Sequence, residues 1–322
     1  MRAILHFVVF QAICVLSFPT GAVAADSPTA VAKSPEAKAI AFLVEHVPRW
    51  RKENGCYSCH NNGDAARALY RAAEMKYEFD RESLADTTDW LTHPERWKDN
   101  GGDGEFSDKL LADVQFAAAL AEAVRTGAAK DRTALRRAAE IVVERQDEDG
   151  SWIIRPQTAL GSPATWGRTL ATVMSRETLV TADAERFAPA IRRADEWLKS
   201  HEPKTVVDAA ALLALSAGVR NDEQRRASRR LIRDGEDEEG GWGPFTTSPP
   251  EPFDTALVLL ALAPRADDAE ITPLLRRGRA YLLRIQLEDG SWPETTRPAG
   301  AESYAQRLST TGWATLALFA TR

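Results

Sequence analysis

The sequence predicts an all-α protein whose helices form an (α/α)6 barrel, that is, six helical hairpins closed into a toroid. Long runs of Ala, Leu, Arg and Glu dominate, and no run of alternating β-branched residues indicates a strand. A loop rich in acidic residues, Gly and Trp recurs along the chain, as does a type of apolar segment. Closure of six such hairpins would bury the apolar faces that an open stack of repeats leaves exposed at its ends.

The recurring loop gives the length of the repeat. It reads QDEDGSW at 146–152, EDEEGGW at 236–242 and QLEDGSW at 286–292. The tryptophans that end these loops are 90 and 50 residues apart, which fits a unit of about 45–50 residues. The apolar segments at 207–215 and 253–262 resemble each other, and residues 64–69 are a shorter version of them.

Each unit is expected to contain an outer amphipathic helix, a polar loop and an apolar inner helix. The predicted hairpins span residues 35–77, 80–127, 131–181, 184–218, 221–264 and 270–320. Residues 26–34 read as a flexible lead-in, and residues 35–322 as one toroid without a separate domain.

The first 25 residues have the features of a secretory signal peptide. Arg2 precedes an apolar run over 3–18, and residues 22–24 (AVA) form a small-x-small cleavage site. The run is shorter than the ~20 residues needed to cross a bilayer, so a retained anchor is the weaker alternative. We therefore expect an exported, periplasmic protein of a bacterium, with no membrane span after the signal has been removed.

Charge and cysteine content narrow the classes of function. Without the signal, 40 basic residues face 47 acidic ones, which gives a net charge of −7. No block of Lys and Arg indicates a nucleic-acid partner. Because Cys14 would leave with the signal, Cys56 and Cys59 are the only cysteines expected in the mature chain.

Cys56, Cys59 and His60 form a C-x-x-C-H motif, which is typical of the attachment site of a c-type haem. Two thiols at this spacing can add to the two vinyl groups of one porphyrin, and the adjoining imidazole becomes the proximal iron ligand. A redox pair would require a thioredoxin-like fold, but no strand-helix-strand pattern surrounds these cysteines. A closed zinc site requires four ligands, and the sequence has no second pair of cysteines. A disulfide across so short a loop would stabilise little. The motif therefore predicts one covalent haem c.

The sequence offers two main candidates for the second axial iron ligand. His93 ranks first, because Pro94 ends the outer helix of the second hairpin beside the haem loop. His201 ranks second, because it ends an outer helix on the same face but across the ring. An open position, or one held by water, is the alternative.

The acidic Gly/Trp loops resemble the QW repeats of squalene–hopene cyclases and related terpene cyclases, a group that includes protein prenyltransferase β-subunits. Residues 309–318 (STTGWATLAL) are similar to the helix that follows the last QW turn of those cyclases. The resemblance covers residues 130–322 well and the first two hairpins only through the repeat period. It implies the toroid fold and does not decide the activity.

Two departures from this group bear on activity. Class II cyclases protonate their substrate from the middle Asp of a D-x-D-D-T-A motif, and the matching stretch at 251–256 reads EPFDTA, with Phe253 in place of the acid. A phenyl ring cannot donate a proton to an alkene, so triterpene cyclisation is not expected. Prenyltransferases bind zinc through Asp, Cys and His. The mature chain has no Cys outside the haem motif, so prenyltransferase activity is not expected either.

Aspartates recur near the starts of the predicted inner helices, at positions 64, 113, 208 and 254. They are expected to cap these helices or to satisfy the positive end of the helix dipole, and an acidic cavity mouth is the alternative. The loop tryptophans are expected to staple neighbouring hairpins, with Gln146 and Gln286 capping adjacent backbone.

Together these observations predict an exported c-type haem protein that transfers electrons to a redox partner protein. One alternative is an enzyme that uses the toroid cavity for haem-dependent oxidation or for a terpenoid-type reaction on a small apolar ligand. The other is a binding, scaffold or haem-sensing module.

Overall fold

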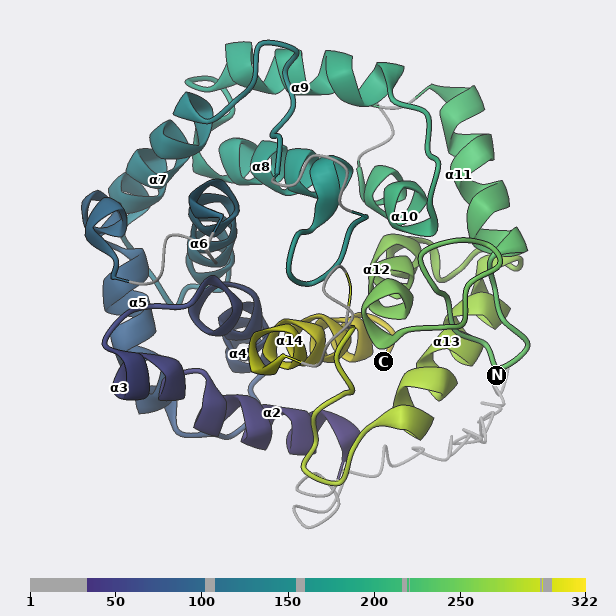
Figure 1. The fold of residues 1–322 in the computed structure, drawn as a ribbon, viewed down its shortest axis with the longest axis horizontal. Helices are drawn as coiled ribbons and strands as arrows, with labels where there is room; N and C mark the ends of the chain where they lie inside the picture. The colour runs from purple at the N-terminus through teal and green to yellow at the C-terminus, as the bar shows by residue number, and fades with distance from the viewer. Residues whose placement is uncertain are drawn as a thin grey trace, which may run out of the picture.

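The computed structural model describes residues 34–101, 108–154, 160–215, 219, 221–295, 297 and 303–322. An inner and an outer ring of helices surround a common centre, as Figure 1 shows. The predicted signal peptide (1–25) and residues 26–33 of the predicted lead-in lie outside the described residues.

The two rings alternate along the chain. The outer ring consists of α2 (Pro35–His46), α3 (Arg49–Asn54), α5 (Ala85–Leu91), α7 (Arg132–Glu144), α9 (Ala188–Ser200), α11 (Asp222–Asp234) and α13 (Ile271–Ile285). The inner ring consists of α4 (Ala66–Glu74), α6 (Lys109–Arg125), α8 (Gly167–Asp183), α10 (Val206–Ala214), α12 (Pro252–Leu262) and α14 (Tyr304–Ala320). A π-helical segment, η1 (Cys59–Ala65), leads into α4, and 3-10 turns η2 (Arg81–Leu84) and η3 (Pro94–Asp99) flank α5. The described residues contain no strand beyond one isolated bridge, so the predicted all-α toroid is confirmed.

The outer and inner helices differ in how many of their residues are buried, as the residue patterns predict. In α11 only Gln224, Ser228 and Ile232 are buried, because its many charged side chains face water. In α14, by contrast, 13 of 17 residues are buried, because this helix has neighbours on every side. The inner ring therefore forms the core, and the outer ring covers it.

The loop tryptophans join the two helices of their own hairpin. Each indole is fully buried and donates its Nε1–H to a carbonyl ten residues earlier on the outer helix, at 2.7–2.8 Å. Each Trp backbone N–H donates to a threonine of the following inner helix, as Trp152 does to Thr172 Oγ1 at 3.1 Å. The tryptophans therefore join the two helices of one hairpin, whereas the sequence had predicted that they join neighbouring hairpins.

The glutamines of the same loops cap adjacent backbone, as predicted, and they also join neighbouring hairpins, which the sequence did not predict. Gln146 Nε2 donates to the carbonyls of Gly150 and Ala190, at 2.8 and 2.9 Å. In the second loop Glu236 replaces this glutamine and forms an ion pair with Arg277 of α13 instead, with both contacts at 2.6 Å.

The last loop closes the ring onto the first helix. Gln286 Nε2 donates to the carbonyls of Gly290 and Pro35, each at 2.9 Å. Gly290 has a φ of +91° and lies so close to α2 that a Cβ there would overlap the Lys38 carbonyl. Arg279 of α13 adds a contact to Glu36 and another to the Leu318 carbonyl.

Replacement of Gln286 with alanine is expected to lower the free energy of unfolding by about 1–3 kcal/mol, because two hydrogen bonds are lost. Urea unfolding followed by circular dichroism would measure the loss. Gln146→Ala removes the equivalent pair of bonds inside the ring, together with a contact from Arg193, and should destabilise at least as much. A normal stability for Gln286→Ala beside a destabilised Gln146→Ala would show that this closure contact is not made.

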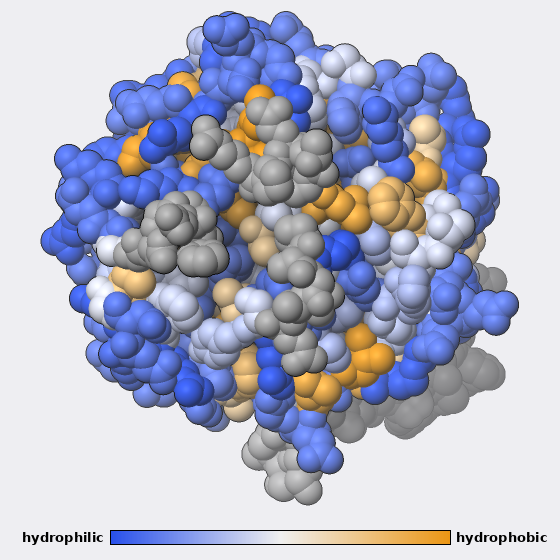
Figure 2. All heavy atoms as spheres, in the orientation of Figure 1, coloured by the Kyte–Doolittle hydropathy of each residue, from blue (hydrophilic) through white to orange (hydrophobic). Residues whose placement is uncertain are grey.

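The surface seen along the ring axis is mostly hydrophilic at its rim, with apolar side chains gathered nearer the middle (Figure 2). No helix among the described residues is both long enough and apolar enough to span a membrane.

Candidate functional site: a rim pocket and a buried polar centre

The three residues of the C-x-x-C-H motif line one large pocket at the rim of the toroid. Its volume is about 1040 Å³. Its walls come from residues 56–60, from η3, from the start of α6, from the end of α7 and from the start of α14. The loop ends of the first three hairpins therefore meet the last inner helix at this pocket.

Aromatic and charged side chains share the pocket wall. The aromatic ones are Trp50, Tyr57, Trp97 and Phe116, and the basic ones are Lys98, Lys109 and Arg145. The pocket also contains acidic groups, among them Asp113, whose Oδ2 accepts from Arg145 Nε at 3.2 Å. Such a mixed wall suits a large apolar molecule that has polar or anionic groups at its edge.

The backbone of the motif is fixed from both sides. Gly55 ends α3 with a φ of 72°, and the Ser58 side chain accepts from the His60 N–H at 3.2 Å. The Asn100 amide accepts from the Tyr57 N–H and donates to the Tyr57 carbonyl, at 2.9 and 2.8 Å. The π-helical segment η1 then starts at Cys59, and such segments often mark functional sites.

Both cysteines are free thiols. Cys56 is buried and its sulfur accepts from Trp50 Nε1 at 3.4 Å. Burial above all, and then the charge of Asp64, raise the pKa of Cys59 to about 12. In the folded protein this thiol stays protonated, which disfavours a redox pair.

His60 is held by the last inner helix. Its Nδ1 is hydrogen-bonded to Ser309 Oγ of α14 at 2.8 Å. Burial lowers the pKa of His60 to about 4, so the imidazole is neutral near pH 7. Only its second nitrogen, Nε2, is left for any further partner.

His93 and His201, the two predicted candidates for the second iron ligand, have partners of their own. His93 has a side chain 35% exposed, and its Nδ1 donates to the Asp89 carbonyl at 2.7 Å. The pocket wall includes its neighbours Pro94 and Glu95. His201 stacks on Trp197, with ring centroids 4.6 Å apart, beside α9. His93 as an iron ligand stays a prediction.

A carboxyl group lies buried at the centre of the toroid, next to this pocket. Asp64 of η1 is 1% exposed. Its Oδ2 accepts from Gln115 Nε2 at 2.9 Å and from Trp166 Nε1 at 3.1 Å. Its Oδ1 has no well-aligned hydrogen bond, although Arg67 Nη1 lies 3.8 Å away. Gly312 allows α14 to pack closely against η1, because a Cβ at this position would lie only 2.9 Å from the Ala65 Cα.

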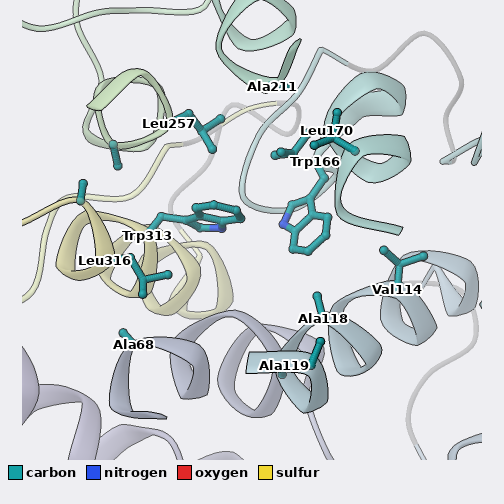
Figure 3. Packing of buried hydrophobic residues seen from close by; sticks show 14 of the residues in the cluster. Ala68, Val114, Ala118, Ala119, Trp166, Leu170, Ala211, Leu257, Trp313 and Leu316 are labelled. Atoms are coloured by element: carbon teal, nitrogen blue, oxygen red, sulfur yellow. The ribbon is translucent and has the colours of Figure 1, made fainter. Parts of the chain in front are cut away.

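Two tryptophans flank the buried carboxyl. Figure 3 shows Trp166 and Trp313 pointing toward each other between the inner helices. Their rings meet edge to face with centroids 5.8 Å apart, and the Arg67 guanidinium lies 4.4 Å from the Trp313 ring centroid. Trp166 has a φ of 55°, a strained conformation for a bulky residue. Strain of this kind is typical of functional sites.

Burial raises the pKa of Asp64 to about 6. The Arg67 charge and the nearby Ser309, Trp166 and Trp313 act in the opposite direction, although Ser309 and Trp313 make no well-aligned bond to Oδ1. Because Ser309 also bonds His60, one hydroxyl lies between the buried carboxyl and the pocket wall. The carboxyl is partly neutral in mildly acidic solution.

Phe253, the residue at the position of the cyclase acid, is fully buried against Trp313, with ring centroids 6.0 Å apart. The adjoining Asp254 is also fully buried, and the Arg297 guanidinium contacts both of its oxygens, at 2.8 and 3.1 Å. Burial raises the pKa of Asp254 to about 7, against the effect of Arg297. It is therefore a structural ion pair rather than a free acid.

The expected capping role fits only some of the aspartates. Asp208 and Asp254 do lie in the first turns of α10 and α12. Asp64 and Asp113 lie beyond the caps, which are Ser58 and Asp108. The sequence did not identify Gln115, Trp166 or Ser309 as site residues, although Ser309 begins the segment 309–318 that resembles a cyclase helix.

No protein-family profile matches the chain. A curated drimenyl diphosphate synthase from Streptomyces showdoensis is 27% identical over 218 residues, which cover 62% of this chain. The match covers 40% of that protein, so the chain spans well under two thirds of its relative's length.

Solved structures with the same architecture include a single-residue variant of the type II terpene cyclase MstE from Scytonema, in complex with geranylgeranyl dihydroxybenzoate. It is 14% identical, with a TM-score of 0.58 over 89% of this chain and 97% of that one. A glycosidase variant, 11% identical, reaches a TM-score of 0.59 over 92% of this chain and 98% of the other. At such identities the similarity concerns the fold alone.

The predicted electron-transfer function is wrong. The curated relative is a terpene synthase and the structural neighbours include type II terpene cyclases, rather than electron carriers. The part of the chain that the structure describes also contains no group of three or more His, Cys, Asp or Glu side chains placed to hold a metal ion. What the comparisons do establish is a terpene cyclase-like α/α toroid fold.

Proposed function

We propose that this protein acts on a linear isoprenoid, and that Asp64 supplies the proton that Phe253 cannot. The observation behind the proposal is the environment of Asp64. It is a fully buried carboxyl whose pKa is raised to about 6. Its Oδ2 is bonded by Gln115 and Trp166, whereas its Oδ1 accepts no well-aligned hydrogen bond and lies 3.8 Å from the Arg67 guanidinium.

This arrangement suits a proton donor. A buried carboxyl that is partly neutral near the working pH can give its proton to a substrate alkene. The N–H groups of Gln115 and Trp166 then stabilise the carboxylate that is left. The faces of Trp166 and Trp313 can stabilise a carbocation, because an aromatic ring attracts positive charge to its face.

The rim pocket fits the substrate class. Its volume of about 1040 Å³ and its aromatic wall suit a long apolar chain, and Lys98, Lys109 and Arg145 suit an anionic head group. One similar protein is named for drimenyl diphosphate and another was solved in complex with geranylgeranyl dihydroxybenzoate, so each name pairs a terpenoid group with a polar one. Asp64 does not itself line this pocket, but Ser309, which bonds the pocket residue His60, lies close to the carboxyl.

Incubation of the purified protein with farnesyl diphosphate, geranylgeranyl diphosphate and squalene, between about pH 5 and pH 8, tests the proposal. We expect a cyclic product from at least one of them, detected by gas chromatography–mass spectrometry, with faster turnover at the acidic end. Absence of both conversion and saturable binding across the panel would overturn it. Conversion only after Phe253→Asp would place the acid at position 253 and contradict Asp64.

A further inference from the structure

We propose that the rim pocket also holds one haem, bound covalently by Cys56 and Cys59 and ligated by His60. The haem would share the rim pocket and its basic residues with the isoprenoid. The attachment residues Cys56, Cys59 and His60 are distinct from the proposed acid Asp64, so the two proposals can fail separately. It concerns attachment of the group and does not restore the electron-carrier function.

The pocket fits such a group in size and in chemistry. All three residues of the motif face the same volume of about 1040 Å³, at the upper end of the usual range for cofactor sites. Trp97 and Phe116 offer apolar surface to a porphyrin plane. Lys98, Lys109 and Arg145 offer positive charge to its two carboxylates.

The orientation of His60 is the second observation. A histidine that ligates a metal nearly always uses its other ring nitrogen in a hydrogen bond that fixes the ring. Ser309 makes such a bond to Nδ1 at 2.8 Å, across 249 residues of sequence. This leaves Nε2 of His60 as the nitrogen for iron.

The attachment chemistry balances without another reactant. Each S–H adds across one vinyl C=C of the porphyrin, with sulfur bonding to one carbon and hydrogen to the other. Two S–H bonds and two π bonds break, two C–S and two C–H bonds form, and no electron is gained or lost. Both sulfurs are free thiols, as this addition requires.

When bound, the haem would supply an iron centre inside the rim pocket that the isoprenoid is proposed to enter. The residues of the chain would hold it in place: Cys56 and Cys59 through thioethers, and His60 as the ligand oriented by Ser309.

The test is expression in a bacterial host with an active c-type cytochrome maturation system. We expect a polypeptide mass larger by one haem under denaturing conditions and a pyridine haemochrome spectrum of a two-thioether haem. Cys56→Ala with Cys59→Ala should lose the haem completely, while Ser58→Ala, in the same loop, should keep it. An unmodified mass for a chain that is helical by circular dichroism, from a host that loads a control cytochrome, would overturn the proposal.

Two further variants separate the proposed roles. Ser309→Ala should keep the covalent haem but shift the Soret band or the reduction potential, because His60 loses its orienting bond. An unchanged spectrum and potential would contradict the role of Ser309. Asp64→Asn should keep the haem, and a haem-free wild-type protein that converts an isoprenoid would overturn the haem site while leaving Asp64 as the acid.

Discussion

Replacement of Asp64 with asparagine is expected to reduce isoprenoid turnover by about 10²–10⁴-fold, the range typical of a lost general acid. The amide has nearly the shape of the carboxyl, and its oxygen can still accept from Gln115 and Trp166. The fold and substrate binding should therefore survive, and the loss should appear in kcat rather than in KM. Product formation at saturating substrate measures this effect.

The pH dependence gives an independent check. Asp64 donates only in its protonated form, so the wild-type rate should rise as the pH falls through about 6, the pKa of the buried carboxyl. Asp208→Asn is the matched control, because Asp208 also lies near the start of an inner helix but beside His201. A rate for Asp64→Asn that equals the wild-type rate at every pH would show that the acid lies elsewhere.

Replacement of Arg297 with methionine is expected to lower the free energy of unfolding by about 3–5 kcal/mol near pH 8, because the buried Asp254 loses its countercharge. Asp254 is fully buried and Arg297 contacts both of its oxygens. The variant also releases Glu251, but that side chain is 30% exposed and can be hydrated. Arg297 Nη2 further donates to the Gly161 carbonyl, which adds to the loss.

The sign of the pH effect follows from the pKa of Asp254. Burial raises it to about 7 from 3.8 even with Arg297 present, and removal of that charge raises it further. A carboxyl whose pKa is raised in the folded state contributes stability fully below the unfolded value, and this contribution is lost as the pH rises through the folded value. The variant should therefore be most stable near pH 4 and weaken steadily toward pH 8.

Urea unfolding at several pH values would measure the effect. In the double variant Arg297→Met with Asp254→Asn the pH-dependent part of the loss should disappear. If Arg297→Met has the same pH profile as the wild type, the ion pair does not stabilise the fold as described.

The fold could be predicted because the contacts that build each hairpin are local. Trp152 bonds Val142 ten residues before it and Thr172 twenty residues after it, and such spacings recur with the repeat. The glutamine caps follow the same repeat, so the ring and its closure can be inferred from three similar loops.

The buried centre could not be predicted in this way. Asp64 meets Gln115 and Trp166, which lie 51 and 102 residues further along the chain, only after the inner ring has closed. From the sequence it resembled an ordinary residue at a helix start. The C-x-x-C-H motif was visible, but its contact with Ser309 was not, because the two segments come from opposite ends of the toroid.

Arg279 gives the closed ring a property that open repeat arrays lack. Its guanidinium contacts Glu36 in the first described helix and the Leu318 carbonyl near the end of the last one. An open array can fray from a terminal repeat while the rest stays folded. Here the beginning and the end of the ring share one side chain, so we expect them to open together, as a single cooperative unit.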